Sequence, residues 1–297
     1  MAVIGSARAF QGPSTQALMP TLVPDHLVPK AIAWGAGALQ TASIVGPSIG
    51  GLFHAFGAFV PYAATGTMGL VGAALVSLMR VKKTSHPKQP VSAASLFSGI
   101  HFIRGHSVVL GSISLDLFAV LLGGATALLP VFTRDILHVG AWGLGALRSA
   151  PAVGSLAMSI YLARHPPQRK VGRKMFLAVF VFGLTTMLFG ISRSLPLSLF
   201  ALTFLGAADT ISVVIRSSLV QLETPNDMRG RVGAVNSLFI GTSNQLGEFE
   251  SGVTASLFGT VAATVIGGAG TLAVALLWMK IFPALRDFDQ FEKKKPT

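Results

Sequence analysis

Six ionisable side chains stand inside apolar stretches of this 297-residue sequence. A charge near the centre of a membrane costs at least about 2.5 to 3.5 kcal/mol on insertion scales, so each of them is a candidate for gating or proton transfer. They are Asp116, Arg148, Asp209, Arg216, Glu248 and Glu250. The chemistry that they favour is ion pairing and reversible protonation, and we predict neither catalytic residues nor metal ligands.

The depths of these charges in the spans assigned below suggest two ion pairs. Asp116 and Arg216 fall in the cytoplasmic third of their spans, whereas Arg148, Glu248 and Glu250 fall in or near the outer third. We expect Asp116 to meet Arg216, and Arg148 to meet Glu248 or Glu250, as pairs that form and break while two halves of a helical bundle rock. Permanent pairs that only orient helices are the alternative.

Asp209 is the first choice for a carboxylate that carries a proton. It lies near the middle of its span and two helical turns from Arg216 on one face, which is too far for a direct ion pair. Intramembrane carboxylates without a fixed partner are typical members of proton relays.

A stripe of polar residues follows helical spacing late in the chain, and a face of this kind is not tolerated in lipid. Its members are Asn236, Ser243, Asn244, Glu248 and Ser251. We favour a water-filled cavity over a neighbouring helix as the surface that the stripe meets, because it runs through most of the span. Glu250 points away from the stripe and is expected to serve packing or an outer gate.

The elements that carry these residues are membrane spans. The sequence is 51% hydrophobic and 11% charged, whereas a soluble domain carries roughly 25% charge. Apolar runs of sufficient length predict eight spans, at 31–53, 58–79, 108–132, 141–163, 175–192, 197–220, 233–257 and 260–281. Residues 1–20 resemble the tail of a further helix. The net charge of +12 does not indicate nucleic-acid binding, because most Lys and Arg lie in connections between spans.

Basic residues also orient the chain. They concentrate in alternate connections, whereas the opposite connections hold only Arg134 and Arg193. This asymmetry places the C-terminus in the cytoplasm. In the long connection before residue 107, four apolar residues recur at helical spacing: Leu96, Phe97, Ile100 and Ile103. This spacing indicates an amphipathic surface helix, with the start of the next span as the alternative.

Three motifs resemble the major facilitator superfamily, in its branch of enterobactin-exporter-like transmembrane secretion effectors. Residues 228–252, MRGRVGAVNSLFIGTSNQLGEFESG, are similar to that branch's entry into its eleventh helix. The fifth-helix motif of drug/proton antiporters is matched by Gly46, Pro47, Gly50 and Gly51, although Ala42 replaces an expected glycine. A cytoplasmic latch is matched by Gly172, Arg173 and Lys174, with Arg229 and Arg231, although Arg169 replaces an expected acidic residue.

The resemblance implies an all-α membrane protein with the superfamily's helical bundle, built from eight full transmembrane helices and a partial N-terminal one. The implied parts are a remnant of the N-terminal half at 1–80, a linker with the amphipathic helix at 81–106, a complete six-helix C-terminal half at 107–283, and a cytoplasmic tail at 284–297. About three helices and part of a fourth would then precede Met1.

The implied function is secondary active transport in the bacterial inner membrane, with proton-coupled export of a small amphipathic molecule such as a siderophore or drug. No cofactor is expected, and no HExxH, G-x-S-x-G or P-loop motif supports an enzyme. The alternative is a truncated fragment that cannot transport unless another subunit completes it.

Overall fold

The computed structural model describes residues 42, 45–46, 49–54, 56–78, 93–165, 167, 169–225 and 228–290, without the side chains at 93–96, 125, 163 and 229. Every regular element within these ranges is a helix, which confirms the all-α fold. The tail predicted at 1–20, Pro47 and most of the span at 31–53 lie outside the described residues.

Five helical segments are long and apolar enough to cross a membrane, judged on length and composition among the described residues. They are α3 (Phe59–Ser77), the segment Ser107–Ile136, α8 (Val171–Ile191), α9 (Leu195–Glu223) and α11 (Thr260–Ile281). Two further helices, α7 (Ala141–Arg164) and α10 (Arg229–Phe258), are as long but carry more polar residues. A helix that lines a polar cavity needs less apolar surface than one surrounded by lipid, which accounts for their composition.

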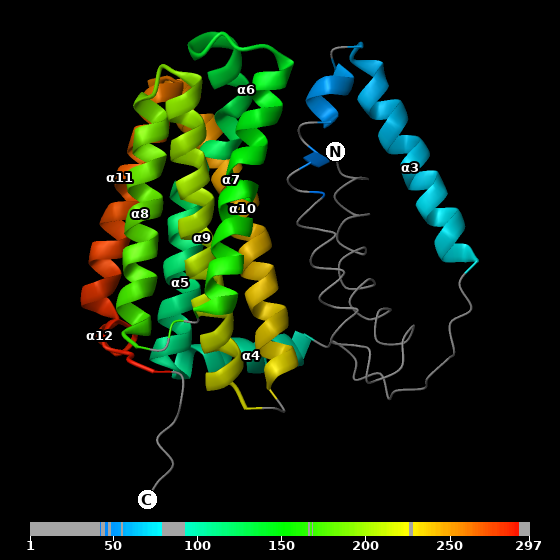
Figure 1. Ribbon diagram of the computed structural model, residues 1–297. Coiled ribbons are helices and arrows are strands. Elements are labelled where there is room, and N and C mark those ends of the chain that lie inside the picture. The colour runs from blue at the N-terminus through cyan, green and yellow to red at the C-terminus, as the bar shows by residue number, and fades with distance from the viewer. Residues whose placement is uncertain are drawn as a thin grey trace, which may run out of the picture.

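Helices α5 (Ser107–Leu122), α7, α8, α9, α10 and α11 run side by side as one bundle (Figure 1). Across one end of the bundle lies α4 (Ala93–Gly105), at the end that also holds α12 (Pro283–Arg286). An extended residue, His106, with φ −119° and ψ 97°, separates α4 from α5. The connection before residue 107 therefore ends in a separate crosswise helix and not in an early start of the next span. Its Ile103 packs into the bundle, whereas Phe97 is 70% exposed.

The span predicted as continuous over 108–132 is broken. Helix α5 ends at Leu122, and after Gly123 and Gly124 the chain continues as η2 (Ala125–Leu128), α6 (Leu129–Val131) and the π-helix η3 (Phe132–Ile136). A Cβ on Gly124 would lie 2.6 Å from the carbonyl oxygen of Gly247 in α10. The two glycines thus end α5 and also allow its backbone to approach α10 closely.

Glycines also bring α7 and α9 together. A Cβ on Gly154 would collide with the carbonyl oxygen of Thr203, and one on Gly206 with that of Pro151. Because neither helix carries a side chain at these points, their backbones approach closely. This contact holds Ser155 against α9, where its hydroxyl hydrogen-bonds the hydroxyl of Thr210.

Candidate functional site

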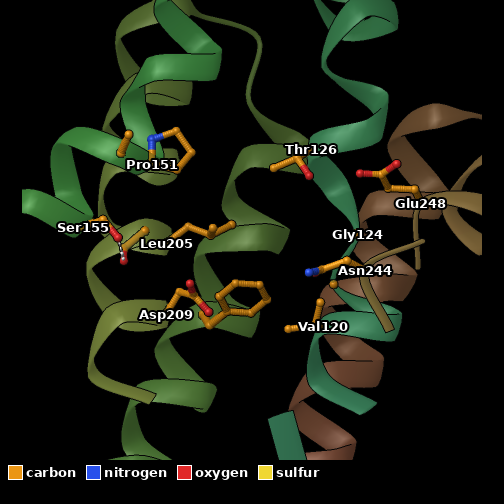
Figure 2. Close-up of a pocket in the computed structure, with 13 residues that line it drawn as sticks. Val120, Gly124, Thr126, Pro151, Ser155, Leu205, Asp209, Asn244 and Glu248 are labelled. Carbon is orange, nitrogen blue, oxygen red and sulfur yellow. Dashed lines mark hydrogen bonds between the residues drawn. The ribbon is translucent and has the colours of Figure 1, made fainter. Parts of the chain in front are cut away.

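A cavity of about 360 Å³ opens between α5, α7, α9 and α10. Its polar lining residues are Thr126, Ser155, Asp209, Asn244 and Glu248, set among apolar residues that include Val120, Phe182 and Leu205. Asp209 and Ser155 lie on one wall, and Asn244 and Glu248 on the opposite one (Figure 2). Two carboxylates from different helices therefore face one space, whose volume suits a small molecule.

A second chamber of about 420 Å³ adjoins this cavity and shares Thr126, Pro151 and Glu248 with it. Arg148 also lines the second chamber, so the helices bring Arg148 and Glu248 to the same space as expected. Among the described residues, however, no ion pair within 4.0 Å joins Arg148 to Glu248 or Glu250. The pair predicted there is not formed, because open space separates the two helices that would supply it.

Glu250 lines neither chamber. Its carboxylate accepts a hydrogen bond from the Thr254 hydroxyl on its own helix at 2.7 Å. The expectation that Glu250 points away from the polar stripe agrees with this placement.

The ion pair expected between Asp116 and Arg216 is present and joins α5 to α9. Both residues are buried, with 5% and 3% of their surface exposed. The Nε atom of Arg216 and the hydroxyl of Ser212 are also buried, and neither has a hydrogen-bond partner among the described residues. A buried ion pair with an unsatisfied donor is not optimised for stability alone.

A gap of about 10 Å³ connects the main cavity with this ion pair, and Asp116, Asp209 and Ser212 line it. A space of this size holds about one water molecule. Glu248, Asp209 and Asp116 are therefore arranged in series from the second chamber to the buried pair. Asp209 occupies the middle position and forms no ion pair within the described part of the chain.

From the sequence, the polar stripe on α10 could face either a cavity or a neighbouring helix. Its members meet both. Asn244 and Glu248 line the cavity, whereas Ser243 and Ser251 are buried against the rest of the bundle. The side-chain oxygen of Asn236 is buried without a partner among the residues described.

Sequence reasoning missed Thr126, Ser155 and Phe182 as lining residues. Ser155 could have been found, because it follows Arg148 by seven residues and so lies on the same face of α7. Thr126 could not, since its position depends on the break after α5.

The predicted cytoplasmic latch divides into two separate contacts. The amide of Gly172 donates to the carbonyl oxygen of Phe288 at 2.9 Å, so the start of α8 is held by the segment that follows α12. Arg173 and Lys174 are exposed there. Arg231 instead lies beside α4, where a Cβ on Gly99 would stand 3.0 Å from its carbonyl oxygen. The side chain of Arg229 lies outside the description.

The fifth-helix motif makes one close contact. A Cβ on Gly51 would lie 2.7 Å from the carbonyl oxygen of Ala141 at the start of α7, whereas a Cβ on Gly46 or Gly50 would meet no described atom within 4 Å. Gly51 thus performs the close helix approach that the motif predicts, next to the helix that carries Arg148.

The family model described as "Transmembrane secretion effector" matches residues 1–296. The chain belongs to this family of major facilitator superfamily transporters. Relatives of the chain include the "Enterobactin exporter EntS" proteins of Escherichia coli strain K12 and of Shigella boydii serotype 18. Each is 25% identical to it over 279 residues, which cover 92% of this chain and 66% of the relative.

The chain thus spans just under two thirds of the length of these relatives. Family membership and the apolar helices make it a multi-pass membrane protein of a transporter family. The unpaired carboxylates between its helices are the features to which a transport mechanism must assign a role.

Proposed function

We propose that this chain is a secondary active transporter that exports a small amphipathic molecule from the cytoplasm across the bacterial inner membrane, in exchange for protons. The observation that carries the proposal is the cavity of about 360 Å³ with Asp209 and Glu248 on opposite walls, where neither carboxylate forms an ion pair with a described residue. Side chains of this kind inside a membrane bundle are expensive unless they serve a pathway.

Asp209 is the proposed proton carrier. It faces the main cavity on one side and the narrow gap that leads to Asp116 on the other, so a proton on Asp209 has polar neighbours in both directions. Glu248, which faces both chambers, would exchange protons with the outer side. The buried pair of Asp116 and Arg216 would close the path towards the cytoplasm in this conformation.

The nature of the substrate is argued from the cavity walls. Val120, Phe182 and Leu205 offer apolar surface, and Ser155 and Asn244 offer hydrogen bonds. Such a mixture suits a molecule with an apolar body and a few polar groups. The relatives named as enterobactin exporters support a siderophore as one test substrate, with drug-like dyes as the other.

The decisive experiment measures export of dyes, drugs and catecholate siderophores from cells that express the chain at matched membrane abundance. We expect efflux that collapses when an uncoupler removes the proton gradient, and at least a tenfold loss of this efflux in Asp209→Asn. Asp135→Asn is the matched control, because Asp135 is exposed and pairs with Arg134 away from both chambers.

Unchanged efflux in Asp209→Asn would show that Asp209 is not the proton carrier. Efflux that continues at the same rate after the uncoupler is added would show that the proton gradient does not drive export. A well-inserted wild-type chain that exports none of the compounds would instead favour the alternative from the sequence, a fragment that requires a completing subunit.

A further inference from the structure

A second cavity lies on the outside of the bundle, away from the carboxylates. It has a volume of about 310 Å³ and is formed by α7, α8 and α9 near the end that holds α12 (Figure 1). Its walls are largely apolar and include Leu162, Leu177, Val181, Phe204 and Ile211. Leu177 is 62% exposed and Phe204 is 48% exposed. In a membrane this surface faces lipid chains, not water.

The rim of this outer cavity is polar and basic. Lys174 in the first turn of α8 contributes to it, together with Tyr161 and His165 at the end of α7. The rings of Tyr161 and His165 are stacked, with their centroids 4.9 Å apart. Neither Lys174 nor His165 forms an ion pair within the part of the chain that is described.

The acidic group described at the start of α8, Asp289, accepts a hydrogen bond from the amide of Lys170 and forms no ion pair with Lys174. The first turn of α8 contains no acidic residue, although the positive end of the helix dipole lies there and makes a cation unfavourable. The backbone amides of Lys170, Val171 and Gly172 already donate to Asp289 and Phe288. An anion at this place would therefore be held by side chains at the rim.

The two parts of the outer cavity together select its occupant. A soluble anion would leave the apolar walls empty, and a neutral lipid would leave Lys174 without a counter-charge. A molecule with an anionic head and an apolar tail satisfies both, and basic sites between helices near the membrane surface bind such lipids. We propose that the outer cavity is a binding site for an anionic phospholipid, with its phosphate at Lys174, His165 and Tyr161 and an acyl chain along Leu177 and Phe204.

The site is separate from the transport cavity but lies directly behind it. Ala178 and Ala208 line both the outer cavity and the narrow gap beside Asp209. A bound acyl chain would thus pack against the same pair of small residues that closes this gap, on the opposite side of the α8 and α9 contact.

The experiment is native mass spectrometry of the full chain, delipidated in detergent and titrated with phosphatidylglycerol or with phosphatidylcholine of the same acyl chains. Wild type is expected to bind phosphatidylglycerol at least fivefold more tightly. Lys174→Gln is expected to lose about fivefold in phosphatidylglycerol affinity, as the removal of one basic residue near the surface implies, with no change for phosphatidylcholine.

Lys280→Gln is the matched control, because Lys280 is exposed at the same end of the bundle, in the last turn of α11, and lines no part of the outer cavity. Its phosphatidylglycerol affinity is expected to match that of wild type. Lys174→Arg keeps the charge and is expected to retain binding, so a general loss of structure in Lys174→Gln would be recognised.

Equal affinity for the two lipids would overturn the proposal. It would also be overturned if Lys174→Gln lost no more affinity than Lys280→Gln, or if Lys174→Arg lost as much as Lys174→Gln. Competition by soluble glycerol phosphate at the same concentrations as the lipid would also overturn it, because the site would then recognise a free anion. None of these results depends on transport, so the proposed export function is tested separately.

Discussion

At the scale of single residues, the buried pair of Asp116 and Arg216 is the best defined electrostatic contact of the bundle. Taking both charges out of water is costly, and their attraction repays that cost only while both are present. Loss of one partner leaves the other charge buried alone. The pair therefore makes each residue sensitive to replacement, although the pair as a whole contributes little to stability.

We predict that Asp116→Leu and Arg216→Leu each lower the free energy of unfolding by about 3 to 5 kcal/mol, whereas the double variant recovers most of the loss. Thermal unfolding of the four proteins in one detergent measures this coupling. A double variant no more stable than either single variant would show that the pair is not coupled. If the double variant is stable but exports more slowly, the pair also acts as a gate.

The residue scale also shows what the sequence could reveal. Charges inside apolar runs are visible without coordinates, so Asp116, Asp209 and Glu248 were all identified, and the depth argument joined Asp116 to Arg216. The same argument predicted a partner for Arg148 that the structure does not provide. Depth gives only the position along the membrane normal, whereas an ion pair also needs two helices that face each other closely.

At the scale of elements, the positions of Asp209 and Ser155 depend on the contact of α7 with α9. Gly154 and Gly206 allow this contact, because each faces a backbone carbonyl of the other helix. An added methyl group at either point cannot be absorbed by rotating a side chain. The helices must move apart, and the hydroxyl contact of Ser155 with Thr210 must lengthen.

We therefore predict that Gly206→Ala destabilises the bundle by about 1 to 3 kcal/mol, as expected for overpacking, and reduces efflux even though it removes no polar group. Gly241→Ala is the control, since a Cβ at that position on α10 would meet no described atom within 4 Å and alanine favours a helix more than glycine does. Thermal unfolding and efflux are measured for both. Equal stability of the two variants would contradict the packing argument.

Most elements were predictable because apolar length and charged breaks define them. The spans expected at 58–79, 175–192 and 260–281 end within a few residues of α3, α8 and α11. The break after Leu122 was not predicted, because Gly123 and Gly124 can equally serve close packing in an unbroken helix. Only the structure, in which Gly124 lies against α10, shows that the two glycines both end the helix and pack closely.

At the scale of the whole molecule, orientation links the site to a direction of transport. The chain has no cysteine, so single-cysteine variants can be labelled without background. Ser194 is exposed between α8 and α9, and Gln290 is exposed beyond α12. These two positions lie at opposite ends of the bundle, since one helix, α9, separates Ser194 from the end where α4 and α12 lie.

We predict that a membrane-impermeant maleimide labels Ser194→Cys in cells whose outer membrane is permeable and whose inner membrane is intact. Gln290→Cys should react only after the inner membrane is opened, because the positive-inside rule predicts that the basic connections lie in the cytoplasm. The reverse pattern would invert the orientation, and Glu248 would then face the cytoplasm instead of the outer side. The carboxylates would still lie in series, but a proton moving down its gradient would reach Asp116 first and Glu248 last. The buried pair of Asp116 and Arg216 would then close the path at the outer end and not at the cytoplasmic end.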